Sequence, residues 1–123
     1  MRSPRDFFHP LAIGAPDPIR EIPFKPSRMI HFLDLSNEKF VAKVPQLAQQ
    51  ADILLGNLED AIPADRKEAA RAGLVKVGKE VDLGGTPLWT RINSLDSPWC
   101  LDDLTTLVTE IGDKLEVVMV PKV

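Results

Sequence analysis

The sequence predicts an α/β fold in which parallel strands alternate with crossover helices. Four short apolar runs alternate with segments whose apolar residues recur at helical spacing. The runs are nearly continuous in Val, Ile and Leu, which is typical of strands buried on both faces of a parallel sheet. Two architectures fit this order, an open doubly wound sheet and part of a (β/α)8 barrel. No glycine-rich phosphate loop follows any of the runs, which disfavours the dinucleotide-binding fold.

Composition narrows the class of protein and its partners. The 123 residues suffice for one domain with a core of its own. A hydrophobic content of 44%, a charged content of 27% and a net charge of -3 indicate a soluble globular chain and give no reason to expect nucleic acid or a membrane as partner. No apolar run approaches the ~18–20 residues that span a bilayer. The single cysteine, Cys100, excludes an internal disulfide and favours a cytoplasmic location.

The chain divides into two parts. Residues 1–28 form a proline-rich amino-terminal arm, which we expect to be mostly irregular because proline fixes φ and removes a backbone donor. Residues 29–123 carry the alternating pattern, and its first strand is expected over residues 29–35.

The first helix is expected directly after this strand. Ser36 or Asn37 can cap it, and Pro45 should kink or shorten it. Its apolar stripe is spaced by four, three and four residues and consists of Phe40, Val44, Leu47 and Ala51.

Three further strands are expected near residues 52–58, 88–92 and 115–120, with Gly84-Gly85 as a turn before the third strand.

The helices between these strands show start and stop signals. Asp65 and Glu68 resemble a capping box. Ser97-Pro98 is a strong helix start, and Gly112 is a helix stop. The apolar stripes are Ala70, Leu74, Val77 and Val81 in the earlier helix, and Leu101, Leu104, Val108 and Ile111 in the later one.

Arg91 and Asn93 stand at the end of the third strand, two residues apart and therefore on one face of it. Arginine offers a planar fork that pairs with a carboxylate and keeps its charge. The pair can clamp an anionic substrate or stabilise a developing enolate oxygen. Arg91 can equally form a structural ion pair with Glu59 or Asp60 from the neighbouring strand.

Glu59 and Asp60 follow the second strand and point to opposite faces if the strand continues through them. Carboxylates at strand ends can hold Mg²⁺ directly or through water, or they can orient Arg91. Lys122 ends the fourth strand, where it can neutralise an anion, form a Schiff base or simply be solvated.

Four segments resemble, in order and spacing, the HpcH/HpaI aldolase and citrate lyase β-subunit superfamily. They are Leu58-Glu59-Asp60-Ala61, residues 64–71, residues 91–98 and Val120-Pro121-Lys122-Val123. Within the superfamily the likeness is strongest to the malyl-CoA/β-methylmalyl-CoA lyases.

The resemblance implies the amino-terminal half of a (β/α)8 barrel, since a complete barrel needs about 250 residues. It implies a homo-oligomeric carbon–carbon lyase that reversibly cleaves a 3-hydroxyacyl-CoA, such as malyl-CoA, to glyoxylate and acetyl-CoA, or to propionyl-CoA from the methyl homologue. Mg²⁺ or Mn²⁺ would polarise the oxo-acid carbonyl. Its ligands are expected beyond Val123, so this chain alone is expected to be inactive.

The resemblance also assigns roles to individual residues. Arg91 would contact the oxo acid or stabilise the enolate, with Asn93 beside it. Phe32 and Lys43 would lie near the CoA and substrate pocket. Glu59 and Asp60 would orient the site or bind metal-bound water.

Two positions depart from the family pattern. Residues 34–37 replace its Pro-Gly-Ser-Arg segment, and Asn57 stands where many relatives have Asp. Two alternatives stay open. One is a citrate lyase β-type subunit acting on an acyl-carrier thioester, against which the long arm and the missing glycine-rich segment count mildly. The other is a non-catalytic half-barrel that serves binding or assembly.

Overall fold

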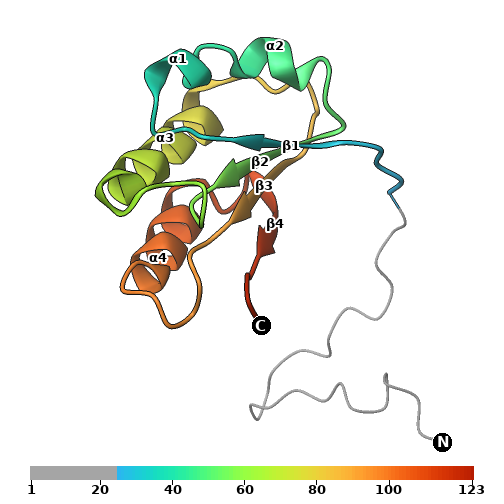
Figure 1. Cartoon of the computed structure of the whole chain (residues 1–123). Coiled ribbons are helices and arrows are strands. Elements are labelled where there is room, and N and C mark those ends of the chain that lie inside the picture. The colour runs from blue at the N-terminus through green and yellow to red at the C-terminus, as the bar shows by residue number, and fades with distance from the viewer. Residues whose placement is uncertain (1–24) are drawn as a thin grey trace, which may run out of the picture.

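The computed structural model describes residues 25–123, which form a four-stranded parallel sheet in the order β1-β2-β3-β4 (Figure 1). The strands are β1 (Ile30–Leu33), β2 (Ile53–Asn57), β3 (Leu88–Arg91) and β4 (Leu115–Met119). The connections are α1 (Glu38–Val41) with α2 (Val44–Ala48), η2 (Ala64–Arg66) with α3 (Lys67–Glu80), and α4 (Cys100–Ile111). The predicted parallel α/β architecture is confirmed, and it is consistent with half of a (β/α)8 barrel. Apart from residues 25–28, the predicted arm lies outside the described residues.

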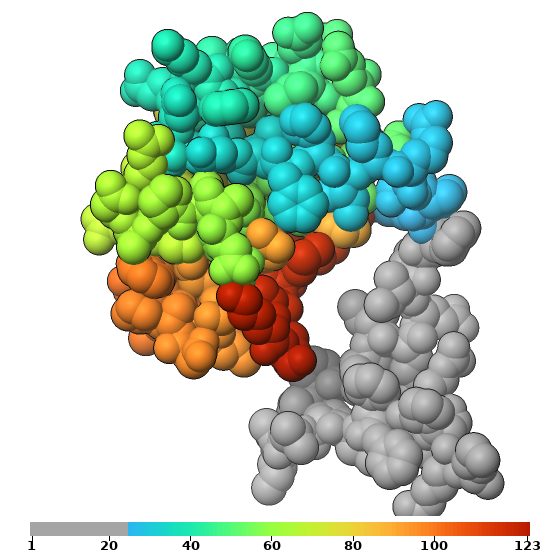
Figure 2. Space-filling model, in the orientation of Figure 1, coloured from blue at the N-terminus to red at the C-terminus, as the bar shows by residue number. Residues whose placement is uncertain are grey.

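The hydrophobic core lies between the sheet and its helices. It includes Leu33, Leu54 and Leu88 from the strands, with Leu74 from α3 and Leu107 from α4. Because strand side chains alternate between faces, the neighbours of these core residues point to the opposite face, which we call the open face. Figure 2 shows the two edges of the sheet, β1 in blue and β4 in red, bordering the hollowed side of the molecule.

The first helix is interrupted, as Pro45 predicts, but its apolar stripe is partly wrong. The segment forms two helices, and Pro45 lies in the first turn of α2. Asn37 is the cap of α1, since its Oδ1 accepts from Lys39 N at 3.0 Å. Val44 is buried, whereas Phe40 is 43% exposed. The break between α1 and α2 removes the continuous helical phase that would have placed these two side chains on one face.

The predicted capping box is also wrong. Asp65 lies within the 3-10 turn η2, and no side chain caps either η2 or α3.

The stripe predicted for α4 is partly wrong: Ile111 is buried and Leu104 packs against the core, but the other two members face solvent. Leu101 and Val108 are 74% and 61% exposed. The helix begins at Cys100, two residues after Pro98, and buries Cys100, Asp103, Leu107 and Ile111. The true face was missed because it contains an aspartate. Gly112 does cap the helix as predicted. Among the described residues, no helix is long and apolar enough to cross a membrane.

Candidate functional site

Polar side chains gather where β2 and β3 reach their carboxyl ends. Asn57 and Arg91 are register partners on these neighbouring strands. Arg91 Nε donates to Asn57 Oδ1 at 2.9 Å, and Arg91 Nη2 lies 3.3 Å from Glu59 Oε2. The guanidinium is thus held by two polar groups at the end of β2. Ligands of parallel α/β barrels bind at this edge of the sheet.

Phe32 supports the same guanidinium from β1. Its ring centroid lies 5.2 Å from Arg91 Cζ, within the range of a cation–π contact. The Arg91 side chain nevertheless keeps 24% of its surface exposed, and Phe32 is 49% exposed. The structure therefore brings together two predicted site residues, Arg91 and Phe32, as an accessible cationic and aromatic surface on the open face.

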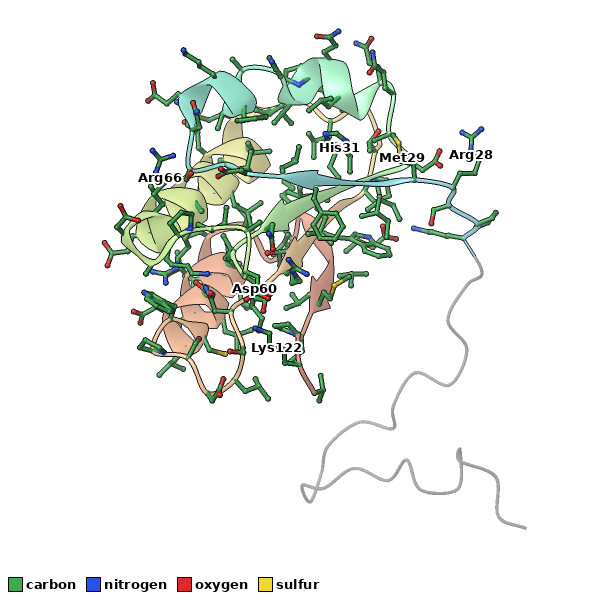
Figure 3. All side chains as sticks on the ribbon, in the orientation of Figure 1. Arg28, Met29, His31, Asp60, Arg66 and Lys122 are labelled. Atoms are coloured by element: carbon green, nitrogen blue, oxygen red, sulfur yellow. The ribbon has the colours of Figure 1, made fainter. Side chains whose placement is uncertain are left out.

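Lys122 links both acidic residues that follow β2. Its Nζ donates to Asp60 Oδ1 at 2.9 Å, and Figure 3 labels both residues. The same Nζ lies 2.8 Å from Glu59 Oε1. The buried Glu59 Oε1 forms this ion pair and has no further polar partner among residues 25–123. Glu59 and Asp60 converge on one ammonium because β2 ends at Asn57 and strand alternation does not reach them.

These contacts fix the charge states of Lys122 and Glu59. The Lys122 ammonium and the backbone N–H of Asp60 lower the pKa of Glu59 to about 2. The Glu59 and Asp60 carboxylates raise the pKa of Lys122. Lys122 is therefore a charged ammonium near neutral pH, which disfavours the Schiff-base role.

Lys67, the first residue of α3, hydrogen-bonds to the loop after β2. Its Nζ donates to the carbonyl oxygens of Leu58 at 2.7 Å and Glu59 at 2.9 Å. It also lies 5.5 Å from the ring centroid of Trp99. Burial lowers the pKa of Lys67. Lys67 could not be identified as a site residue from the sequence, because a lysine in the first turn of a helix is usually solvated.

Two predicted site residues have partners other than Arg91. Asn93 is 3% exposed, and its Nδ2 donates to Asp103 Oδ2 at 2.7 Å. The expectation that it shares a strand face with Arg91 fails because β3 ends at Arg91. Lys43 is exposed at the start of α2, with its Nζ 5.8 Å from the Phe40 ring centroid.

The described residues do not by themselves form a metal site. Between residues 25 and 123, no three His, Cys, Asp or Glu side chains are grouped to hold an ion. Glu59 and Asp60 are two carboxylates that already contact Lys122. Mg²⁺ requires about six oxygen ligands, so further ligands would have to come from other parts of the protein.

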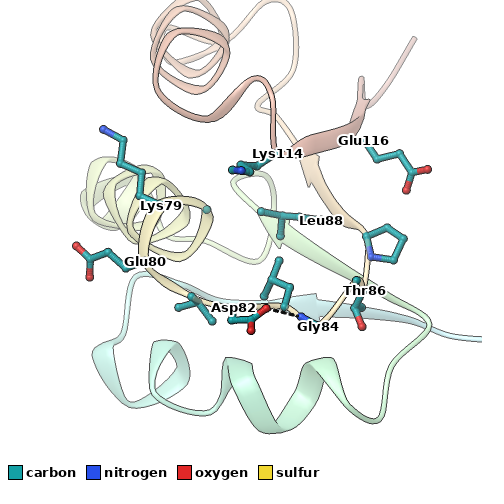
Figure 4. A pocket seen from close by; sticks show the side chains of 13 residues that line it. Lys79, Glu80, Asp82, Gly84, Thr86, Leu88, Lys114 and Glu116 are labelled. Carbon is teal, nitrogen blue, oxygen red and sulfur yellow. Dashed lines mark hydrogen bonds between the residues drawn. The ribbon is translucent and has the colours of Figure 1, made fainter.

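A cavity of about 530 Å³ lies at the opposite end of the strands (Figure 4). It is lined by residues 78–88, which lead from the end of α3 into β3, together with Lys114 and Glu116. Gly84 N donates to Asp82 Oδ1 at 2.9 Å within this loop. In barrel enzymes the amino-terminal face serves stability rather than chemistry, so the Arg91 edge is the better candidate site.

The sheet is consistent with half of a (β/α)8 barrel, and its cationic site lies at the carboxyl ends of the strands. Barrel aldolases and lyases belong to the class of enzymes that have their sites at this edge. Residues 28–123 match the family model of the HpcH/HpaI aldolase/citrate lyase family, and the chain belongs to that family. The resemblance found in the sequence is thus confirmed.

Curated relatives agree with the family assignment. The chain is 55% identical over 118 residues to a malyl-CoA/β-methylmalyl-CoA/citramalyl-CoA lyase of Chloroflexus aurantiacus, covering 96% of this chain and 34% of that protein. It is 38% identical over 76 residues to an L-malyl-CoA/β-methylmalyl-CoA lyase of Cereibacter sphaeroides, covering 62% and 24%. It is 34% identical over 83 residues to the human mitochondrial citramalyl-CoA lyase, covering 68% and 24%. The matched region thus makes up about a quarter to a third of these relatives.

Proposed function

We propose that the whole protein is a carbon–carbon lyase that reversibly cleaves a 3-hydroxyacyl-CoA, such as L-malyl-CoA or β-methylmalyl-CoA. The products would be glyoxylate and acetyl-CoA or propionyl-CoA. The observation that carries this proposal is Arg91, a fixed and partly exposed guanidinium at the carboxyl edge of the sheet. Its position in a chain of the HpcH/HpaI family, with relatives named as malyl-CoA lyases, supports an oxo-acid substrate.

The contacts of Arg91 suggest how it acts. Asn57 and Glu59 fix the orientation of the guanidinium, and the remaining exposed N–H groups can pair with a carboxylate in bidentate geometry. In the cleavage, the 3-hydroxyl would lose its proton and become the oxo-acid carbonyl as the carbon–carbon bond breaks. The electron pair of that bond would move to the thioester, where a positive group stabilises the enolate oxygen until the α-carbon takes up a proton. Arg91 would therefore bind the oxo acid or stabilise the enolate, while the Phe32 ring lines the same surface.

We propose that the enzyme uses Mg²⁺ or Mn²⁺ held by ligands beyond Val123. The metal would supply Lewis-acid polarisation of the oxo-acid carbonyl. Glu59 and Asp60 would contribute at most through water, since both contact Lys122. We also propose that the enzyme is homo-oligomeric and cytoplasmic. The buried free thiol of Cys100 is suited to a reducing cytoplasm.

The test is cleavage of malyl-CoA by the purified full-length protein with Mg²⁺, with released glyoxylate trapped as its phenylhydrazone. We expect release that chelation of the metal abolishes. Cleavage confined to an acyl-carrier thioester would instead support a citrate lyase β-type subunit. Absence of turnover with malyl-CoA, β-methylmalyl-CoA and the carrier thioester would support the non-catalytic module.

A further inference from the structure

Asp103 is a fully buried carboxylate in the first turn of α4, at 0% exposure. Its Oδ1 accepts from Arg71 Nε at 2.9 Å. Its Oδ2 accepts from the backbone N of Asn93 at 3.0 Å and from Asn93 Nδ2 at 2.7 Å. A buried charge is costly unless it is paired and hydrogen-bonded, and here one side chain satisfies three donors from two other segments.

The network connects α3 to the loop that follows β3. Arg71 lies on α3, one turn after Lys67, which holds the end of β2. Asn93 lies two residues after Arg91, at the start of the loop into α4. Arg71 contacts Asp103 through Nε, while its buried Nη2 has no acceptor among the described residues. One oxygen of Asp103 thus anchors the carboxylate to α3, and the other is left for Asn93.

We propose that Asp103 is a positioning residue for Arg91. By accepting from both the backbone N and the Nδ2 of Asn93, it fixes the chain two residues beyond the guanidinium that faces the substrate. Asn93 then acts as the anchor of the loop rather than as a substrate ligand. This inference rests on the proposed lyase function, because the ligand of Arg91 is taken to be the oxo acid.

The test compares Asp103→Asn with Asp102→Asn in the full-length enzyme. Asp102 is the exposed neighbour on the same turn, so the control carries the same change of charge. An asparagine at position 103 keeps the volume but offers one acceptor oxygen instead of two, so either Arg71 or Asn93 loses its partner. Arg71→Lys is the second variant, since it keeps the positive charge and alters only the geometry of the anchor.

Two readouts are taken on each variant. The first is the KM for glyoxylate and for acetyl-CoA in the condensation direction. We expect Asp103→Asn to raise the KM for glyoxylate roughly tenfold or more, because small displacements of a positioned group cost large factors, while the KM for acetyl-CoA stays within about twofold. The second is hydrogen exchange of the peptide covering residues 92–99, which should become faster. Arg71→Lys should shift both readouts in the same direction, and Asp102→Asn should shift neither.

Other outcomes overturn the proposal in distinct ways. A lower kcat with both KM values unchanged would mean a smaller fraction of folded enzyme, hence a purely structural Asp103. Faster exchange without a change in the KM for glyoxylate would show that Asp103 orders the loop but does not position Arg91. A further outcome is that the wild-type protein forms no thioester product while Asp103→Asn still exchanges faster than wild type at residues 92–99. In that case the proposed lyase function fails, but the anchoring of the loop by Asp103 stands.

Discussion

Replacing Arg91 by lysine in the full-length enzyme should distinguish the contribution of the forked guanidinium geometry from that of the positive charge. Arg91 uses Nε on Asn57 at 2.9 Å and Nη2 near Glu59 at 3.3 Å, and it lies over Phe32. A lysine has one nitrogen, which cannot satisfy these partners and pair with a substrate carboxylate at the same time. The loss of one preorganised charged donor costs about 2.7–4 kcal/mol, or roughly 100- to 1000-fold in rate.

The measurement is kcat/KM for glyoxylate with acetyl-CoA, alongside far-UV circular dichroism to verify the fold. The matched control is Arg66→Lys, since Arg66 is an exposed arginine in η2 (Figure 3). We expect the control to match the wild-type protein. Kinetics of Arg91→Lys within about twofold of wild type would show that Arg91 is a structural ion-pair residue, and the proposed role would be wrong.

Three further outcomes are expected. Lys67→Met should destabilise the enzyme by about 1–3 kcal/mol, seen as a lower urea midpoint, because two buried carbonyl oxygens lose their donor; the exposed Lys76→Met should not, and equal midpoints would contradict the contact. Folding lowers the pKa of Glu59 from 4.5 to about 2, so its contribution to stability is complete above pH 4.5 and is lost as pH falls towards 2. Glu59→Gln should therefore flatten the dependence of the unfolding free energy on pH in this range. An unchanged slope would contradict the ion pair between Glu59 and Lys122. Within residues 25–123, Ile30 is 36% exposed and Phe32 49% exposed, and the outer edges of β1 and β4 pair with no strand of that region. The isolated 123-residue chain should therefore self-associate, and a monodisperse monomer in sedimentation velocity would contradict this.

Most of the fold could be predicted because it depends on local patterns. The apolar run Ile53-Leu54-Leu55 of β2 identifies a buried strand without any tertiary information. Arg91 was recognisable as a candidate site residue because it stands at the carboxyl end of a strand, where parallel α/β barrels bind their ligands. Its ion pair with Glu59 was predicted as one of two interpretations. In the structure, Arg91 contacts Glu59 and still keeps part of its side chain exposed.

The supporting residues could not be predicted, because their burial depends on partners far along the chain. Asp103 lies on the core face of α4 only because Arg71 compensates its charge, and in the sequence the two residues show no pattern that links them. The predicted stripe of α4 therefore followed Leu101 and Val108 instead. Lys67 was missed for the same reason, since its acceptors are backbone carbonyls that carry no sequence signal.

Formation of malyl-CoA tests the central claim most directly. Full-length wild-type protein and Arg91→Ala are incubated in parallel with glyoxylate, acetyl-CoA and Mg²⁺, and the thioester products are identified by mass spectrometry. We expect malyl-CoA with the wild-type protein and at least 100-fold less, by the estimate for one lost charged donor, with the variant. Equal yields from both proteins, or no malyl-CoA from either, would contradict the assignment of an Arg91-dependent lyase.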